Sequence, residues 1–528
     1  MRRDEILISY SNPEGYITYD YDKRVLPALN IYFNDSVGRD CIAALSWLFK
    51  TSNERPGSGI PICGPLNPAS TGILAISRAN PRLSLISRHL DQRLPLPALN
   101  TPFSTERSVS VEPDDLEYNP PPRASPLLNN IINNHNSSTT AQRTREMSTQ
   151  ASHATVLIPG PVEFDHAVLQ SMSHFSESHV GPGFVKTFGE SLTLLRRLFQ
   201  TTSTSSQPFL LAGSGTLGWD LVSANLIERN ENALVLHTGY FGDCFAACLE
   251  TYGAKATQLK APIGDQPSLS EIEQALKEKP YKILTVTHVD TSTGVLADIK
   301  AIAALVRRVS PDTLVVVDGV CSVGAEEIAF DAWDLDVVLT ASQKAIGCPP
   351  GLSVVMLSGR AIQCFKARKS PPASYYASIA NWLPIMQNYE ARKPSYFATP
   401  ATQLVHAMHT TLTQLMSKPL AGRFATHRAT SQRVKKAVAD LGLQQLATKP
   451  ENQSNAMTAI RLPEGVTPQD ILPLLAKKGV VFAGGLHKEI ASKYIRFGHM
   501  GVSATDPTRH DIDRAIAALK EAFAELRK

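Results

Sequence analysis

The sequence lacks the features that mark membrane proteins, nucleic-acid-binding proteins and disulfide-stabilised proteins. No stretch approaches the roughly 18 uninterrupted apolar residues of a membrane helix. Its 52 lysines and arginines nearly balance its 48 acidic residues, and a net charge of +4 gives no strong field of one sign. The seven cysteines include no repeated C-x-x-C pair, which disfavours zinc sites and disulfide frameworks. These absences predict no metal, no nucleic acid and no membrane, and favour a small-molecule partner.

Residues 1–150 differ from the rest of the chain because short apolar fragments alternate with Pro, Ser, Asn and Arg, and the segment becomes low-complexity between 94 and 150. They include three prolines at 120–122 and the polar run NNIINN at 129–134. Such a stretch buries too little apolar surface to offset the entropy of ordering, so we predict a low-complexity, largely disordered extension. Acidic residues among the first 22 positions disfavour a transit peptide, and translation from Met147 is a further alternative.

The compartment is only weakly constrained by the sequence. The C-terminal run ELRK at 525–528 does not match a Ser-Lys-Leu address. With no clear presequence, we expect a cytoplasmic protein, and mitochondrial and peroxisomal locations stay open as alternatives.

From about residue 156 onward, strand-like apolar runs alternate with segments of helical length. This alternation predicts right-handed crossovers and a mainly parallel sheet in an α/β domain at 151–399. After a proline- and aromatic-rich stretch, a long helix begins near Thr402 and a smaller α+β domain follows at 400–528. The expected strands of the large domain are 209–211, 233–237, 282–287, 314–317, 337–340 and 353–357.

Two of these strands lead into polar residues that a buried sheet does not need. The run LVVV at 314–317 is followed by Asp318, and the run ending at Thr340 is followed by Lys344. Continuous β-branched runs are typical of parallel strands buried on both faces, and ligands bind at the carboxyl edge of such sheets. Helix capping by Asp318 and solvation of Lys344 are the structural alternatives.

A glycine-rich turn, GSGTLG at 213–218, follows one predicted strand and opens a helix. Such a turn forms an anion site from backbone amides and the helix dipole. A dinucleotide fold would place an acidic residue at the end of the next strand, but His237 and Thr238 stand there. We therefore interpret Ser214, Gly215 and Thr216 as a cup for one phosphate, and tight strand–helix packing as the alternative.

A phosphate cup, a carboxylate and a lysine are the three groups that pyridoxal phosphate requires from a protein. With the segments SQKA at 342–345, PPG at 349–351 and DGVCSVG at 318–324, the chain resembles the alanine–glyoxylate and serine–pyruvate aminotransferases. These are class V, fold-type I pyridoxal phosphate enzymes. The resemblance runs from about Leu157 to the C-terminus and implies a fold-type I transferase with Lys344 as the catalytic, covalently binding lysine.

The resemblance also implies roles for the residues around the cofactor. Asp318 would face the ring nitrogen, Phe241 would stack on the ring, and Thr291 would lie beside it. Gln343 would bind the phosphate. A polar turn with capping hydroxyls is the alternative for the segment around Thr291.

The remaining expected residues bind substrate or reach another subunit. By resemblance, Arg496 would bind the substrate carboxylate and Gly160 would line the substrate pocket. A planar guanidinium suits bidentate carboxylate binding. Tyr396 and Thr399 would contact the cofactor phosphate of a neighbouring subunit in a homodimer, and a proline-bounded linker is the alternative.

The resemblance predicts an alanine–glyoxylate aminotransferase that forms pyruvate and glycine by a ping-pong mechanism. Serine–pyruvate transamination and other class V transaminations are alternatives because Phe241 stands where some relatives have tryptophan. A nicotinamide-dependent oxidoreductase, an alternative from another class, would explain the glycine-rich turn but not Asp318 or Lys344.

Overall fold

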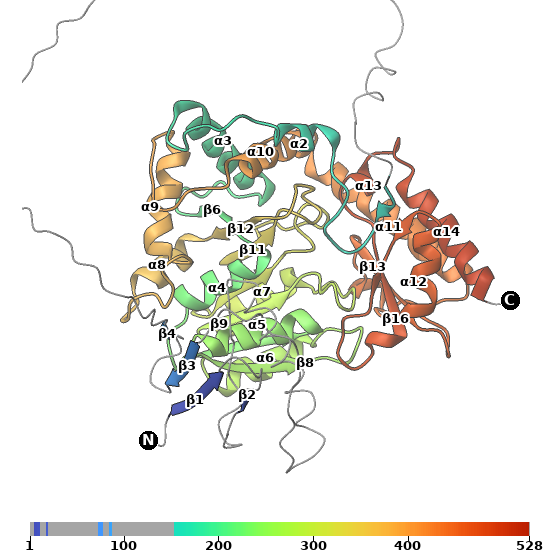
Figure 1. The fold of residues 1–528 in the computed structure, drawn as a ribbon, viewed down its shortest axis with the longest axis horizontal. Helices are drawn as coiled ribbons and strands as arrows, with labels where there is room; N and C mark the ends of the chain where they lie inside the picture. The colour runs from blue at the N-terminus through green and yellow to red at the C-terminus, as the bar shows by residue number, and fades with distance from the viewer. Residues whose placement is uncertain (1–4, 11–16, 19–71, 78–83, 87–152, 527–528) are drawn as a thin grey trace, which may run out of the picture. The chain divides into compact units, whose positions relative to one another are not determined.

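The computed structural model describes residues 5–10, 17–18, 72–77, 84–86 and 153–526 (Figure 1). The chain divides into two units, residues 1–132 and 133–528. In the first unit, an antiparallel sheet has the strand order β2-β1-β3-β4. Its strands are β1 (Glu5–Tyr10), β2 (Ile17–Thr18), β3 (Gly72–Ser77) and β4 (Ser84–Ile86). The rest of the predicted disordered extension, residues 1–150, lies outside the described residues.

The second unit is built on a seven-stranded sheet with the order β6-β12-β11-β10-β9-β7-β8. All neighbours are parallel except those of β12, which is antiparallel to both β11 and β6. The sheet is therefore mainly parallel, and the predicted α/β fold class is confirmed. Its strands are β6 (Gln207–Ala212), β7 (Asn232–His237), β8 (Lys255–Lys260), β9 (Ile283–Thr287), β10 (Leu314–Asp318), β11 (Val337–Ala341) and β12 (Leu352–Leu357).

Helices between these strands cover the sheet and complete its core. In α6 a capping box joins Ser268 and Glu271, and in α7 Asp298 accepts a hydrogen bond from the Ala301 amide, so local side chains set where both helices begin. The helices α3, α9 and α10 pack together at one side (Figure 1). The helices are α2 (His166–Ser171), α3 (Pro182–Leu198), α4 (Gly215–Asn225), α5 (Tyr240–Thr251), α6 (Leu269–Glu278), α7 (Ile299–Val309), α8 (Gly359–Lys366), α9 (Ile379–Glu390) and α10 (Thr402–Met416).

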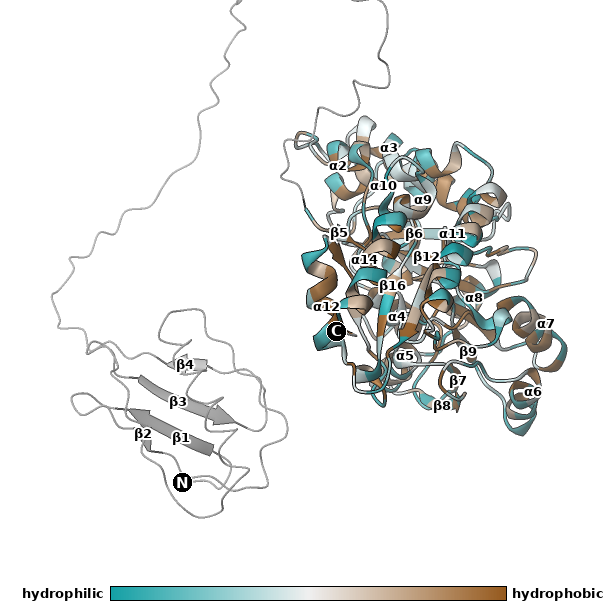
Figure 2. Cartoon of the chain, turned by 90° about the vertical axis from the view of Figure 1, so that its right-hand side faces the viewer, coloured by the Kyte–Doolittle hydropathy of each residue, from teal (hydrophilic) through white to brown (hydrophobic). Residues whose placement is uncertain are grey.

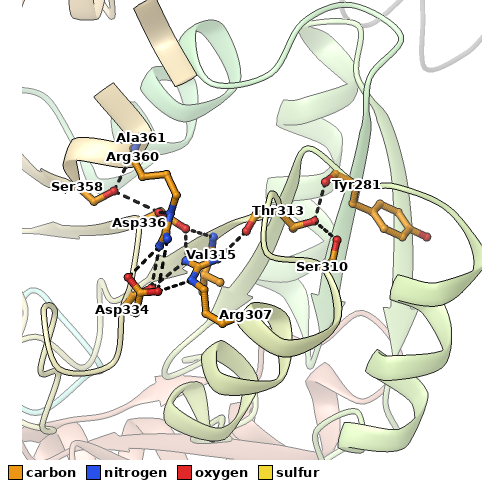
Figure 3. Close-up of polar contacts among 10 residues, drawn as sticks. All are labelled: Tyr281, Arg307, Ser310, Thr313, Val315, Asp334, Asp336, Ser358, Arg360 and Ala361. Carbon is orange, nitrogen blue, oxygen red and sulfur yellow. Dashed lines mark hydrogen bonds and ion pairs between the residues drawn. The ribbon is translucent and has the colours of Figure 1, made fainter. Parts of the chain in front are cut away.

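A buried ion network closes the edge of the sheet at which β11 begins (Figure 3). Asp336 is fully buried and accepts hydrogen bonds from Arg307 Nη2 at 2.5 Å and Arg360 Nε at 2.6 Å. It also accepts from the Val315 amide at 2.7 Å. Because Arg307 lies in α7 and Arg360 in α8, the network joins two helices to the sheet at the edge opposite Asp318.

The C-terminal part forms a second, smaller core around a three-stranded antiparallel sheet of order β13-β16-β15. Helix α14 is amphipathic, with hydrophilic and hydrophobic stripes (Figure 2), and buries the apolar side against this core. Strand β5 (Thr155–Val156) pairs with β14, so the start of the described unit also joins it. The elements are α11 (Leu420–Asp440), β13 (Met457–Arg461), α12 (Pro468–Lys477), β14 (Val480–Val481), β15 (Ala483–Gly484), β16 (Tyr494–Gly498), α13 (Val502–Thr505) and α14 (Asp511–Leu526).

The predicted domain division stays a prediction, and one helix bears on it. Helix α10 lies beyond residue 399, yet its buried residues Val405, Met408 and Leu412 pack into the core of the large sheet. The smaller core takes its first helical residue from Val434 in α11. Among the described residues, no helix combines the length and apolar character that a membrane crossing requires.

Candidate active site

Asp318 is the last residue of β10, and its side chain is buried at the carboxyl edge of the sheet. One carboxylate oxygen accepts a hydrogen bond from Trp219 Nε1 at 2.9 Å, and the other accepts from the Val320 amide at 3.1 Å. Burial raises the pKa of Asp318 to about 6, although these two hydrogen bonds oppose the shift. The carboxylate is therefore held in place by two donors but is poorly solvated.

Lys344 lies three residues beyond the end of β11, in a turn that reaches the segment leading away from β5. Its Nζ donates a hydrogen bond to the Pro159 carbonyl. A Cβ placed on Gly160 would lie 2.8 Å from Lys344 Nζ and would displace this side chain, and the φ of +89° at Gly160 also favours glycine. Burial lowers the pKa of Lys344, which increases the fraction of neutral amine near pH 7.

Asp318 and Lys344 are not paired with each other. No ion pair joins the Asp318 carboxylate and the Lys344 ammonium. The charge of each opposes the pKa shift that burial causes in the other, without overcoming it. Lys344 turns toward Pro159, and Asp318 turns toward Trp219. Two buried ionisable groups are thus held apart by separate partners.

Ser214, Gly215 and Thr216 form the start of α4, with Ser214 as its N-cap. The Ser214 and Thr216 side chains are exposed and form no hydrogen bond within the described part of the chain. Gly215 also has a packing role, because a Cβ there would lie 2.8 Å from Val320 Cγ2. The turn therefore offers free hydroxyls and helix-start amides to an anion, while the glycine brings α4 close to the segment after Asp318.

Gln343 precedes Lys344 and carries an unpaired polar atom. Its Oε1 is buried and has no hydrogen-bond partner among the residues that the structure describes. Its backbone carbonyl accepts from the Val162 amide at 3.1 Å. A buried polar atom without a partner is costly in a closed protein, so this position suits a ligand that pairs with the Gln343 side-chain amide.

Phe241 lies in the first turn of α5 and packs against the residue that binds Asp318. The Phe241 and Trp219 rings meet edge to face, with centroids 6.4 Å apart. Trp219 in turn stacks on Phe245 at 5.4 Å. The structure thus joins Phe241, Trp219 and Asp318 in one continuous set of contacts.

Arg496 in β16 brings the smaller sheet into contact with the turn that holds Thr291. Its Nη1 donates to the Thr291 carbonyl at 3.2 Å, and its Nε donates to the Gly484 carbonyl at 2.7 Å. Burial lowers the pKa of Arg496. No hydrogen bond of Nη2 to a described residue is present, so the outer edge of the guanidinium can still receive a carboxylate.

Tyr396 and Thr399 are not brought together with the other predicted site residues. Tyr396 is 59% exposed, and its hydroxyl lies 3.5 Å from that of Thr399. Its ring packs against His179. Within the described residues, neither side chain forms a hydrogen bond, ion pair or ring contact with Asp318, Lys344 or Arg496.

Sequence reasoning missed Trp219 and gave Asp290 no role. Trp219 stands four residues after Gly215, on the same helical face, so the spacing within α4 could have indicated it. Asp290 is buried and accepts hydrogen bonds from the Ser292 amide at 2.8 Å and the Ser292 hydroxyl at 2.6 Å. Burial raises the pKa of Asp290, and its charge also contributes to the raised pKa of Asp318.

Among the described residues, His174, Glu177 and His406 form a group with ligand atoms close enough for a metal ion. However, the two imidazole rings stack with centroids 4.0 Å apart and planes 11° apart, so their in-plane lone pairs do not converge. His174 Nδ1 donates to the Phe175 carbonyl at 2.9 Å, and His406 is bonded to Glu177. This geometry is that of histidines sharing a carboxylate.

The residues around Asp318 and Lys344 fit pyridoxal phosphate, the cofactor implied by the sequence. They supply the side-chain amide of Gln343 with its unpaired buried atom, exposed hydroxyls and amides at the start of α4, a buried carboxylate and a buried amine. A phosphate requires N–H and O–H donors, a protonated ring nitrogen requires a carboxylate, and an aldehyde requires an amine. Chemically, the site can hold an anionic cofactor and exchange protons at Lys344.

Comparisons with known proteins cover the part of the chain that contains this site. Residues 160–502 match the family model described as aminotransferase class-V. Alanine–glyoxylate aminotransferase 1 of Saccharomyces cerevisiae is 43% identical over 359 residues, which span 66% of this chain and 92% of the yeast protein. The L-aspartate–glyoxylate aminotransferase of Paracoccus denitrificans is 28% identical over 66% of this chain and 87% of its own length.

A solved structure shares the same architecture. The crystal structure of an alanine–glyoxylate aminotransferase from Nostoc sp. matches with a TM-score of 0.65 and 28% identity. The match covers 73% of this chain and 100% of the Nostoc chain.

Proposed function

This chain belongs to the class-V aminotransferase family, and we propose that it transfers the amino group of alanine to glyoxylate, giving pyruvate and glycine. The observation that carries the proposal is the similarity to the yeast alanine–glyoxylate aminotransferase, which extends over nearly all of that protein. The family assignment leaves no role for a nicotinamide oxidoreductase. Serine as donor is the alternative within the family.

We propose that Lys344 and Asp318 hold pyridoxal phosphate from two sides, with Phe241 and Thr291 at the ring. Ser214, Gly215, Thr216 and Gln343 would bind its phosphate, since they provide the exposed hydroxyls, helix-start amides and buried amide described above. When bound, the cofactor supplies an aldehyde for the amino group and a ring that withdraws electrons from the substrate Cα.

Lys344 would act in proton transfer as well as in binding. Because burial lowers its pKa, its amine can be neutral and accept a proton at working pH. Its amine would accept the proton from the substrate Cα and then donate it to the carbon of the cofactor that carries the aldehyde. Asp318 would keep the ring nitrogen protonated, because a buried carboxylate is stabilised by a cation beside it.

Arg496 would bind the carboxylate shared by alanine, pyruvate, glyoxylate and glycine. Its Nε and Nη1 bonds to backbone carbonyls fix the guanidinium plane and leave the outer edge for the substrate. Gly160 would line the pocket beside Lys344. One site that binds the same group in donor and acceptor suits a ping-pong mechanism, in which the first product leaves before the second substrate binds.

We further propose a homodimer in which Tyr396 and Thr399 bind the cofactor phosphate of the partner subunit. The exposure of Tyr396 and the lack of contact with its own Asp318 and Lys344 support this arrangement. A mass measurement in solution tests it. A monomer that is fully active would contradict it.

A donor panel tests the proposed reaction. Purified protein, supplied with pyridoxal phosphate and glyoxylate, is assayed for glycine formation with alanine, serine or aspartate as donor. We expect the highest kcat/KM with alanine. A higher value with serine or aspartate would assign a different donor, and no transfer from any donor would reject the aminotransferase proposal.

A further inference from the structure

In the turn that carries Lys344, consecutive backbone carbonyls each accept a hydrogen bond. The carbonyls of Ser342, Gln343 and Lys344 accept from the backbone amides of Cys348, Val162 and Gly347 at 3.0, 3.1 and 2.9 Å. The next carbonyl, that of Ala345, is served by a side chain instead. Its donor is Arg423 Nη2 at 2.6 Å.

Arg423 also binds the turn that follows Asp318. Its Nε donates to the Gly324 carbonyl at 2.7 Å. Gly324 has φ +91°, and a Cβ there would lie 3.3 Å from the Ala345 carbonyl oxygen, so the two turns touch where Arg423 joins them. One guanidinium therefore spans the segments that place the carboxylate and the amine of the site.

Arg423 has no acidic partner among the described residues. Arg433 and Arg509, in contrast, each form an ion pair with a carboxylate. No ion pair of Arg423 is found among the described residues, and its hydrogen bonds go to backbone carbonyls alone. Burial lowers the pKa of Arg423 to about 10, yet it remains charged at neutral pH. A desolvated cation without a counterion is costly, so its position calls for a role beyond charge pairing.

The helix that carries Arg423 is itself fixed one turn later. His427 Nδ1 donates to the Arg423 carbonyl at 2.9 Å, and His427 Nε2 accepts from the Gly501 amide at 3.2 Å. A Cβ on Gly501 would lie 4.0 Å from the Lys344 carbonyl oxygen. Arg423 of α11 and the backbone at Gly501, which His427 of α11 binds, thus both lie beside the Lys344 turn.

We propose that Arg423 is a positioning residue that sets the placement of Lys344 relative to Asp318 by binding the Ala345 and Gly324 carbonyls. The expected effect of Arg423 on catalysis rests on the proposed function. Its expected effect on the placement of the two turns does not. Without Arg423, the Ala345 carbonyl loses its donor and the two turns can separate. Proton transfer depends steeply on such placement, since a displacement of about 1 Å can cost roughly 100-fold in rate.

The test compares Arg423→Met with Arg428→Met, which removes an exposed arginine from the same helix. Amide hydrogen exchange is measured first on both variants and wild type without added cofactor. For Arg423→Met we expect faster exchange at Gly347 and Cys348, with β10 unchanged. For Arg428→Met we expect no change in either turn.

Turnover per bound cofactor is then measured on the loaded enzymes. We expect kcat of Arg423→Met to fall by roughly 10- to 100-fold, while KM for alanine stays within about twofold. Arg423→Lys, which keeps the charge and one donor, should recover part of kcat. Should Arg423→Met not fold, Arg423→Lys is assessed by the same two measurements.

A purely structural role would lower Tm without these changes. Unchanged exchange at 342–348 together with unchanged kcat per bound cofactor would overturn the proposal. If wild type shows no transamination, the proposed function fails, and the exchange measurement still decides whether Arg423 holds the two turns.

Discussion

Asp318 and Lys344 are both buried, and burial shifts their pKa values in opposite directions because it penalises the charged form of each. Lys344 becomes a better proton acceptor at neutral pH. Asp318, with a pKa raised to about 6, gains from a cation placed beside it. The lowered pKa of Lys344 suits an amine that exchanges protons. The burial of Asp318 suits a carboxylate that faces a protonated ring.

Replacing Asp318 by asparagine tests the charge at this position. The amide oxygen can still accept from Trp219 Nε1, but the amide nitrogen would then face the Val320 N–H, so we expect a moderate fall in Tm. Because the negative charge opposite the ring nitrogen is lost, we expect kcat with alanine and glyoxylate to fall by roughly 100-fold or more. A kcat within threefold of wild type would show that this charge is not used.

Single residues could be predicted where they interrupt a pattern. Asp318 and Lys344 stand out because each follows a β-branched run that needs no polar end. Arg423 could not be found in this way, because its partners Gly324 and Ala345 are about 80 to 100 positions away and are backbone carbonyls. A contact of this kind leaves no local signal in one sequence.

At the scale of elements, one long helix was predicted closely, and one strand of the seven-stranded sheet was missed. The long helix predicted to begin near Thr402 agrees with α10, which begins at that residue. Strand β8, with the sequence KATQLK, was not predicted because it lies at the edge of the sheet and alternates exposed and partly buried residues. Unlike β6 at the other edge, which is buried along nearly its whole length, β8 has no continuous apolar run to reveal it.

The Asp336 network offers a stability test that is separate from catalysis (Figure 3). In Asp336→Asn, the charges of Arg307 and Arg360 lose their buried partner, and breaking a buried pair costs about 3 kcal/mol or more. We expect a lower Tm but unchanged kcat per folded enzyme at 25 °C, because the network lies at the other edge of the sheet from Lys344. A selective loss of kcat would contradict this separation.

At the scale of the whole molecule, the second unit buries three histidines that are neutral in the folded state. Burial lowers the pKa of His288, His427 and His499 to about 3. The unfolded chain takes up protons at these histidines near pH 6.5, whereas the folded chain does not. Their contribution to stability is therefore complete above pH 6.5 and decreases as pH falls toward 3.

His427→Gln isolates one of these contributions. At pH 7.5 we expect the variant to be less stable than wild type, because the bonds to Arg423 and Gly501 are weakened. At pH 5.0 the difference in the free energy of unfolding should shrink by about 2 kcal/mol, since only wild type bears the cost of a neutral histidine. The exposed His166→Gln serves as control. A difference that does not change with pH would contradict the assignment.

The most direct test of the account is the visible absorbance of purified protein loaded with pyridoxal phosphate. We predict the absorbance of lysine-bound cofactor, its loss on addition of alanine, and its return on addition of glyoxylate. Lys344→Ala should lack the lysine-dependent band, whereas Lys366→Ala, which changes an exposed lysine at the end of α8, should keep it. Protein that stays colourless with added cofactor, or a band that alanine leaves unchanged, would contradict the central claim.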